Sequence, residues 1–205
     1  MGSIPTIPTN IKLLQKNIIK SHLAYIIGVA LGDGNLSNPN KRAVRLRITC
    51  DTKYQGIIKN IIKSLKIILP KNKISIVKRK GNCLDISCYS NKLESLLGWK
   101  VGLGSKYKQK VFVPKWIKTN KKFTLLCLKG LFETDGSIYL DRKYKMANFI
   151  TVIPTLADDV MIMVKKIGFK PNIQFLHYNY KKTKITIRVS KNVENFINLT
   201  KIKKI

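Results

Sequence analysis

Two segments of the chain carry the same arrangement of residues that could do chemistry: an apolar run that ends in Asp-Gly. The first is Ile-Ile-Gly-Val-Ala-Leu-Gly-Asp-Gly at residues 26–34, and the second is Leu-Lys-Gly-Leu-Phe-Glu-Thr-Asp-Gly at residues 128–136. Apolar residues at helical spacing followed by glycine predict a buried helix that stops at this point. Each helix would therefore place one aspartate, Asp33 or Asp135, at its C-terminal end.

Two carboxylates at this position are electrostatically unfavourable. The C-terminal end of a helix dipole is negative, and a second carboxylate alongside adds repulsion. A divalent cation relieves both effects, and Mg²⁺ binds carboxylates, waters and phosphate oxygens. Asp33 and Asp135 together would therefore suit two-metal hydrolysis of a phosphodiester bond.

The two predicted helices carry small residues that would let them pack closely: Gly28 and Gly32 on one, Gly130 and Thr134 on the other. Small residues four positions apart lie on one helix face and allow backbone-to-backbone approach. Asp-Gly after an apolar run is often only a helix stop. Two such stops in equivalent places, in a chain with only 10 acidic residues, favour the functional interpretation.

The similarity between the segments continues downstream, which indicates an internal repeat. Thr52 and Thr155 both precede an apolar helical pattern, and Ser90 and Ser190 both precede an apolar-Glu pair. All three blocks recur at a nearly constant offset, so the chain contains two copies of a unit of about 100 residues.

Within each copy, the periodicity predicts a helix, two strands, a helix, two strands and a helix. The fold class is therefore α+β, with two pseudo-symmetric units, antiparallel sheets covered by helices on one face, and the two motif helices paired at the interface. After the first motif we expect a strand at 44–49, a helix at 53–68, a hairpin of 73–79 and 83–89, and a helix at 91–98. After the second we expect strands at 137–143 and 147–153, a helix at 156–167, strands at 172–178 and 184–189, and a helix at 191–198. The predicted boundaries are an N-terminal extension at 1–19, a first unit at 20–110, a linker at 111–120 and a second unit at 121–205.

The charge of the chain points to a polyanionic partner. Its 205 residues include 40 Lys and Arg against 10 Asp and Glu, a formal charge of +30, yet 44% are hydrophobic, too many for a disordered basic tail. The longest strongly apolar stretch, 23–31, is much shorter than the roughly 20 residues of a membrane helix. Four cysteines without a Cys-x-x-Cys pair and two histidines do not fit a zinc site. We expect a soluble intracellular protein that binds nucleic acid and no membrane.

The paired motifs resemble those of the LAGLIDADG homing endonucleases, in the monomeric form that carries both motifs on one chain. The second motif matches closely through Gly130, Glu133, Asp135 and Gly136, whereas the first has Leu31 where an acidic residue is usual. The segments 104–106 and 113–116, ahead of the second motif, also resemble the family.

The resemblance implies a site-specific endonuclease that acts as a monomer without an obligate protein partner. Each half would lay a saddle-shaped sheet along the major groove of double-stranded DNA, and both strands would be cut across the minor groove. The implied cofactor is Mg²⁺, as two or three ions held by Asp33 and Asp135 with the backbone carbonyls of Gly32 and Thr134. Mn²⁺ would substitute, and Ca²⁺ would support binding without cleavage.

The resemblance also implies a basic residue after the last helix of each half, close to the cleaved phosphate. Lys108 and Lys203 match this position best, with Lys106 and Lys110 as near rivals in the first half and Lys201 and Lys204 left open in the second. A polar residue that ends the second strand often joins the water network, and the position falls at Cys50 or Asp51 and at Ile153.

Side chains that alternate along the predicted strands could reach base edges or phosphates. The candidates are Arg45, Arg47, Thr49, Lys73, Ser75 and Arg79 in the first half, and Lys143, Lys184, Thr186 and Arg188 in the second. Lys181 and Lys182 are expected to hold phosphates, and Tyr139 or Tyr178 to pack or to join the interface.

Two alternatives keep the fold but change the function: an intron maturase that binds RNA, and a non-catalytic DNA-binding regulator. An intein endonuclease is less expected, because the sequence starts at Met1 and ends without the residues that protein splicing needs. The abundance of Lys, Ile and Asn suggests an AT-rich coding sequence, as in an organelle (mitochondrion or chloroplast) or in an AT-rich microbial or phage host.

Overall fold

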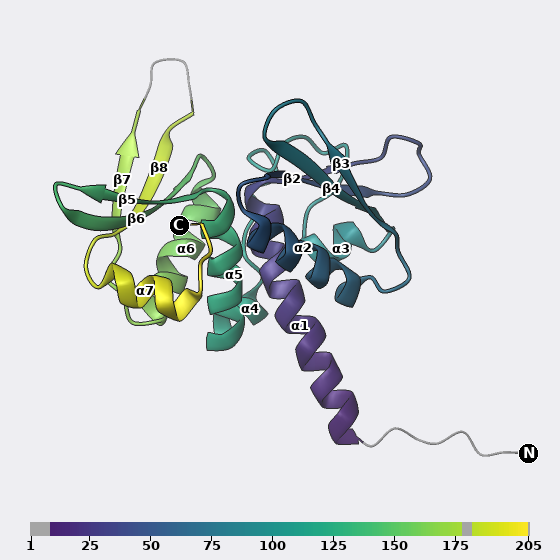
Figure 1. Cartoon of the computed structure of the whole chain (residues 1–205), viewed down its shortest axis with the longest axis horizontal. Helices are drawn as coiled ribbons and strands as arrows, with labels where there is room; N and C mark the ends of the chain where they lie inside the picture. The colour runs from purple at the N-terminus through teal and green to yellow at the C-terminus, as the bar shows by residue number, and fades with distance from the viewer. Residues whose placement is uncertain (1–8, 178–181, 205) are drawn as a thin grey trace, which may run out of the picture.

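The structure is a computed structural model, which describes residues 9–177 and 182–204. The described chain forms two units of the same design, each with a four-stranded antiparallel sheet (Figure 1). The first unit contains α1 (Thr9–Gly32), β1 (Gly34–Ser37), β2 (Arg45–Asp51), α2 (Gln55–Ile68), β3 (Ile74–Lys78), β4 (Cys83–Tyr89) and α3 (Leu93–Leu97). The second contains α4 (Lys115–Thr119), α5 (Lys121–Thr134), β5 (Gly136–Asp141), β6 (Tyr144–Thr151), α6 (Pro154–Lys166), β7 (Asn172–Leu176), β8 (Lys184–Val189) and α7 (Val193–Thr200).

The two sheets have equivalent strand orders, β1-β2-β4-β3 and β5-β6-β8-β7. Their registers also correspond: Ile48 pairs with Gly34 and Ile86, as Phe149 pairs with Gly136 and Ile187. Ile48 and Phe149 are therefore equivalent positions, which fixes the structural alignment of the two units. The predicted α+β fold with an internal repeat is confirmed.

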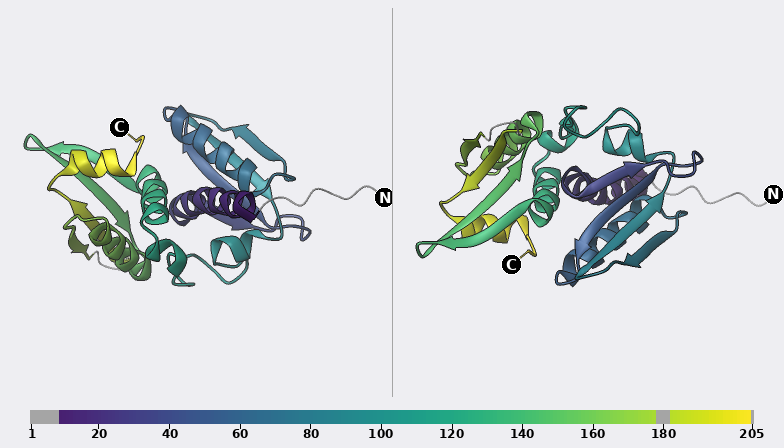
Figure 2. Two further views of the ribbon diagram at one scale, coloured as in Figure 1. Left: turned by 90° about the horizontal axis from the view of Figure 1, so that it is seen from below. Right: turned by 90° about the horizontal axis from the view of Figure 1, so that it is seen from above.

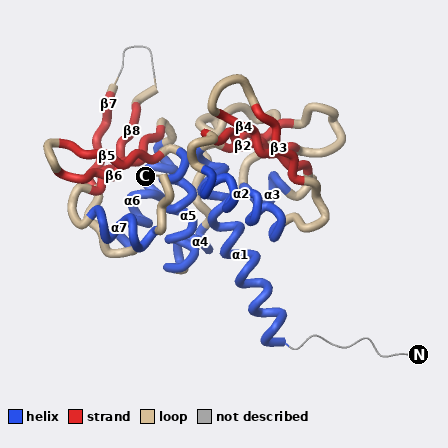
Figure 3. Tube along the Cα trace, in the orientation of Figure 1, coloured by secondary structure: helices blue, strands red, loops and turns tan. Residues whose placement is uncertain are grey.

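Alternation along the central strands separates an apolar face from a polar one. Leu46 and Ile48 of β2 are fully buried against the helices, as are Ala147 and Phe149 of β6. The strands lie on one side of the molecule and the helices on the other (Figure 3). The α1–α5 pair lies between the two units (Figure 2). Both polar sheet faces are therefore left free of helices.

The segment between the units contains a helix and buried side chains, unlike a simple linker. Residues 111–120, predicted as a spacer, include α4, and Val111, Val113 and Ile117 are buried. The backbone N–H of Val113 donates to Asp159 Oδ2 of α6 at 2.6 Å. Alternating valines inside a lysine-rich stretch were the signal that this segment belongs to the core of the second unit.

The motif helix of the first unit also begins earlier than expected. It runs without a break from Thr9, so part of the predicted extension at 1–19 is helical, and residues 1–8 lie outside the described part of the chain. Its exposed turns carry Leu14 and Ile18 on the surface. No helix among the described residues is long and apolar enough to span a lipid bilayer.

Candidate active site at the ends of the paired helices

Helices α1 and α5 touch through their backbones, and glycine makes this contact possible. A Cβ atom on Gly130 would lie 2.5 Å from the carbonyl oxygen of Tyr25 and 2.7 Å from the amide nitrogen of Val29. A Cβ atom on Gly28 would lie closer still to the carbonyl oxygen of Cys127. These separations are well inside van der Waals contact, so no larger residue fits without moving a helix.

The close packing places the two aspartates at equivalent points. The backbone N–H of Asp33 donates to the carbonyl of Val29, and that of Asp135 to Leu131, each at 3.0 Å. Each aspartate is therefore the residue that directly follows its helix. The carboxylate of Asp135 also lies against Gly32, because a Cβ atom there would be 3.3 Å from Asp135 Oδ2. The ends of α1 and α5 that lead into the aspartates continue directly into β1 and β5, and the sheets lie at this side of the helix pair (Figure 1).

A lysine from each unit binds the negative end of a motif helix. The ammonium group of Lys106 donates to the carbonyls of Ala30 at 3.1 Å, Leu31 at 2.6 Å and Gly32. The ammonium group of Lys204 donates to the carbonyl of Thr134. These contacts satisfy carbonyls that the helices leave unpaired and place a cation at each negative dipole end.

The family resemblance favoured Lys108 and Lys203 for this place and left their neighbours open, and in the structure it is Lys106 and Lys204 that reach the helix ends. The Lys108 side chain is exposed and packs against Gly104. Lys203 contributes its backbone N–H to Glu133, and its side chain turns toward Gly56 of α2. Sequence spacing could not separate these lysines, because both segments are irregular and only the path of the chain decides which side chain points inward.

The four charged groups act on one another across the two units. Burial raises the pKa of Asp135 to about 6, and the charge of Asp33 raises it further, while Lys106 and then Lys204 oppose the shift. Burial also raises the pKa of Asp33, opposed first by Lys204 and then by Lys106. Burial lowers the pKa of Lys106 to about 8 against the attraction of both aspartates. Each aspartate thus interacts most strongly with the lysine of the opposite unit.

A hollow of about 260 Å³ beside Asp33 joins residues of both units. The first unit contributes the end of β2, including Thr49, Cys50 and Asp51, and the second contributes Thr134 and Lys204. Burial, followed by the charges of Asp33 and Asp85, raises the pKa of the Cys50 thiol to about 12, so the thiol is neutral.

The strand register corrects the expected partner of Cys50 in the second unit. Because Ile48 is equivalent to Phe149, Cys50 corresponds to Thr151 rather than to Ile153. Ile153 is a buried apolar residue that directly precedes α6. Thr151 restores a polar group at this place, although its hydroxyl accepts a hydrogen bond from the backbone N–H of Ile153 at 3.2 Å.

The donor set at the helix ends suits a hard divalent cation. The carboxylates of Asp33 and Asp135, and the carbonyls of Gly32 and Thr134, supply only oxygen, and burial followed by the charge of Asp33 raises the pKa of Asp135. Within the described part of the chain, no cluster of three or more His, Cys, Asp or Glu side chains could hold a metal. A cation here would therefore complete its coordination with water and substrate phosphate, as Mg²⁺ commonly does.

The polar face of the first sheet carries the predicted contact residues and one acid that sequence reasoning missed. Arg45, Arg47 and Thr49 alternate with buried residues along β2, and Ser75 faces Ser87 across β3 and β4. The carboxylate of Asp85 accepts hydrogen bonds from Thr49 at 2.7 Å and from Arg79 at 2.5 Å.

Asp85 stays ionised despite its burial. Burial alone would raise its pKa, but the hydrogen bonds from Thr49 and Arg79, together with the charges of Arg79 and Arg47, lower it. Arg79 is therefore held along the sheet by an ion pair. Lys73, the remaining predicted contact of this half, is exposed directly before β3.

The second sheet presents an equivalent face. Lys184, Thr186 and Arg188 alternate along β8 with fully or nearly fully buried isoleucines. Arg188 donates to Asn148 Oδ1 at 3.3 Å, and Asn148 donates to the hydroxyl of Tyr139 at 2.9 Å. Lys143 lies in the β5–β6 turn. Tyr178 and Lys181 lie outside the described residues, and the ammonium group of Lys182 lies 4.0 Å from the ring centroid of Tyr107.

Comparisons with known proteins agree with this architecture. Residues 122–200 match the family model of the LAGLIDADG-like domain. A structure from a study of mesophilic variants of the homing endonuclease I-DmoI is similar with a TM-score of 0.65 and 18% identity, over 89% of this chain and 96% of that chain. A variant of I-DmoI in complex with its target DNA in the presence of Mg has a TM-score of 0.64 at 18% identity, over 91% and 97%.

Two further similarities involve proteins with other names. The N-terminal LAGLIDADG domain of DUF199/WhiA has a TM-score of 0.60 at 12% identity, over 100% of this chain and 98% of that chain. The replication factor C small subunit of Methanocaldococcus jannaschii is 30% identical over 131 residues, which are 60% of this chain. The chain spans only 7% of the length of that protein.

The fold and the paired motif helices define the class of architecture: the two-unit LAGLIDADG fold, with both units on one chain. The family model matches the second unit, and the first unit repeats the design of that unit around its own motif helix.

Proposed function

We propose that the protein is a site-specific endonuclease that cuts both strands of a long, asymmetric DNA duplex with the help of divalent metal ions. The observation that carries this proposal is the meeting of Asp33 and Asp135 at the sheet side of a glycine-packed helix pair. Their position between two polar sheet faces would bring the minor groove of a bound duplex to the carboxylates. The similarity to I-DmoI, which has been studied with its DNA target and with Mg, supports the same assignment.

We assign a proposed role to each group of site residues. Asp33 and Asp135, with the carbonyls of Gly32 and Thr134, would hold the ions, which supply an activated water and stabilise the leaving oxygen. Lys106 and Lys204 would offset the negative charge that builds up on the cleaved phosphates. Arg45, Arg47 and Arg188 would orient the duplex through base edges and phosphates.

The cofactor we propose is Mg²⁺, with Mn²⁺ as a substitute and Ca²⁺ as an ion that supports DNA binding without cleavage. We further propose that the protein acts as a monomer. Its two units would supply the pseudo-symmetric pair of sites that cutting two strands requires, so a second copy would not be needed to complete them.

A non-catalytic DNA-binding role is the second candidate, because a fold alone does not specify catalysis. An RNA-binding maturase would also keep the fold. Retention of both aspartates, with a lysine directed at each helix end, favours the nuclease. A regulator gains nothing from two mutually repelling carboxylates at this place.

The test is a cleavage selection on a randomised duplex library, carried out with Mg²⁺ and in parallel with Ca²⁺. The proposal expects a defined double-strand cut with Mg²⁺ and retention of the same sequences without cutting with Ca²⁺. Retention that is equal with and without either metal, with no cut sequence recovered, would instead support the regulator.

A further inference from the structure

Glu133 of α5 is buried and joins three elements that come from distant parts of the chain. Its Oε2 accepts a hydrogen bond from the hydroxyl of Tyr25 on α1 at 2.7 Å. Its Oε1 accepts one from the backbone N–H of Lys203 at 3.0 Å and lies 3.2 Å from the ammonium group of Lys129. One carboxylate therefore links both motif helices to the segment that follows α7.

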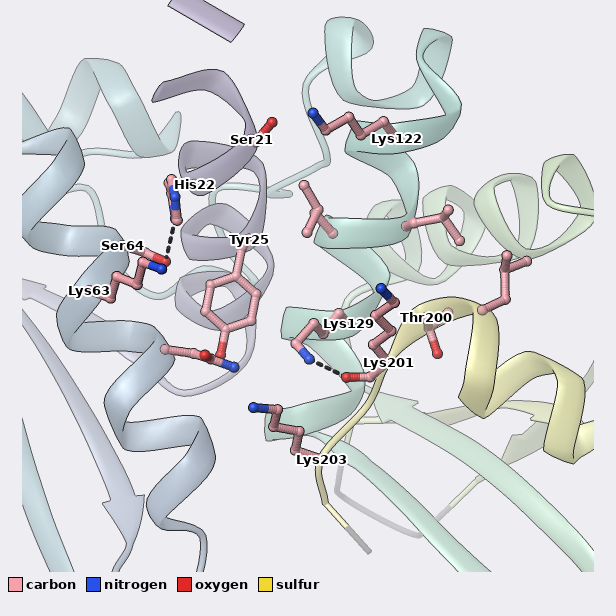
Figure 4. A pocket seen from close by; sticks show the side chains of 14 residues that line it. Ser21, His22, Tyr25, Lys63, Ser64, Lys122, Lys129, Thr200, Lys201 and Lys203 are labelled. Atoms are coloured by element: carbon pink, nitrogen blue, oxygen red, sulfur yellow. Dashed lines mark hydrogen bonds between the residues drawn. The ribbon is translucent and has the colours of Figure 1, made fainter. Parts of the chain in front are cut away.

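The segment 201–204 is fixed at successive points by this cluster. The ammonium group of Lys129 also donates to the carbonyl of Lys201, as Figure 4 shows, and the side chain of Ile202 is buried. Lys203 is held through its N–H by Glu133, and the next residue, Lys204, reaches the end of α5. Lys204 thus directly follows a residue whose backbone is bound by Glu133.

The first unit holds its lysine in a different way. The residues equivalent to Lys129 and Glu133 are Ile27 and Leu31, which are apolar and buried. Lys106 is instead fixed by its own bonds to three carbonyls of α1, and its ammonium group lies 5.9 Å from the ring centroid of Trp99. The two halves of the site therefore differ in what positions their lysines.

We propose that Glu133 is a positioning residue for Lys204 and thereby sets the rate at which one of the two DNA strands is cut. Lys204 lies in the hollow beside Asp33, whereas Lys106 interacts most strongly with Asp135. Loosening the segment 201–204 would impair the half of the site at Asp33 and leave the other half intact. The effect on strand cutting rests on the proposed nuclease function, whereas the positioning of Lys204 rests on contacts within the structure.

The decisive variant gives the second motif the apolar pattern of the first: Lys129→Ile together with Glu133→Leu. Changing both members of the buried ion pair avoids leaving one charge unpaired in the core, and apolar replacements of such pairs are often tolerated. The matched control is Tyr25→Phe, which removes the bond to Oε2 but keeps Oε1 available to Lys203. Circular dichroism and thermal unfolding would verify that both variants fold.

The first readout does not depend on cleavage. Limited acylation with an amine-reactive reagent, followed by mass spectrometry, would measure the exposure of each lysine. We expect Lys204 to react several-fold faster in the double variant, with Lys106 unchanged and with both unchanged in Tyr25→Phe. Equal reactivity of Lys204 in the wild type and the double variant would overturn the proposal.

The second readout is strand-resolved cutting of a supercoiled plasmid that carries the selected target. We expect the double variant to accumulate nicked circles, because the cutting rate of one strand falls while that of the other is unchanged. The fall should be about 10-fold or more, which is typical of losing an outer-shell contact. Equal slowing of both strands would refute the positioning role. A wild type that cuts neither strand would refute the nuclease function, and the acylation result would still decide whether Glu133 positions Lys204.

Discussion

Replacing Gly130 by alanine tests the claim that backbone contact between α1 and α5 builds the site. The added methyl carbon would lie 2.5 Å from the carbonyl oxygen of Tyr25 and 2.7 Å from the amide nitrogen of Val29. Both atoms belong to the backbone of the opposite helix, so no side chain can turn away. The helices would have to separate by roughly 1 Å to restore ordinary van der Waals contact.

The expected loss of stability is about 3 kcal/mol, at the upper end of the usual cost of overpacking. For a protein of this length, that loss corresponds to a fall of about 6–12 °C in melting temperature. Urea unfolding followed by circular dichroism would measure the change in the free energy of unfolding. Gly28→Ala should cost a similar amount, and the double variant less than the sum, because one separation of the helices accommodates both methyl groups.

Gly56→Ala is the matched control for the same chemical change. Its methyl carbon would meet only the flexible side chain of Lys203, 3.2 Å away. Alanine there should be neutral or slightly stabilising, because glycine is the poorer helix former by about 1 kcal/mol at most. The packing argument would be refuted if the free energy of unfolding of Gly130→Ala lay within about 0.5 kcal/mol of the wild-type value, which is the range of ordinary surface substitutions.

Three further predictions follow from the charges at the site. The pKa of Asp135 is raised from 3.8 to about 6, so protonated Asp135 should stabilise the metal-free protein below pH 4, and this stabilisation should disappear as the pH rises through 6. The free energy of unfolding of Asp135→Asn, measured across the same pH range, should not show this decrease. Lys106→Met should abolish most cleavage but preserve Ca²⁺-supported DNA binding in a gel-shift assay, and a parallel loss of binding would contradict its proposed role at the phosphate. Asp85→Asn should release Arg79 and tighten DNA binding, with the slope of log affinity against log salt steeper by about 0.9 for one additional phosphate contact; an unchanged slope would show that Arg79 does not reach the backbone.

The repeat made most of the fold predictable. Gly28 and Gly130 predict where the motif helices touch, and the alternation of Arg45 and Arg47 with apolar residues predicts which face of β2 is polar. These patterns are local, and each is dictated by the period of its element. The correspondence between the copies then placed Asp33 and Asp135 together, although they lie about 100 residues apart.

The details that could not be predicted depend on irregular chain segments and on contacts between units. Lys106 and Lys204 reach the helix ends because of the path their segments take, which no periodicity encodes. The bond from Lys203 to Glu133 is made by the backbone N–H of Lys203 and joins distant segments. Almost any residue could donate it, so the residue type at position 203 does not predict it. The role of Asp85 could not be predicted, because it depends on hydrogen bonds from Thr49 and Arg79, which lie on other strands or loops of the sheet.

The most direct test of the central claim is the single-turnover cleavage rate of Asp33→Asn and of Asp135→Asn on the selected duplex in Mg²⁺. Both proteins should bind the duplex in Ca²⁺ but lose cleavage by about 10³-fold or more, comparable to the loss of a major electrostatic contribution to a transition state. Either variant cutting both strands at the wild-type rate would contradict the assignment of these two carboxylates as the metal-dependent cutting site.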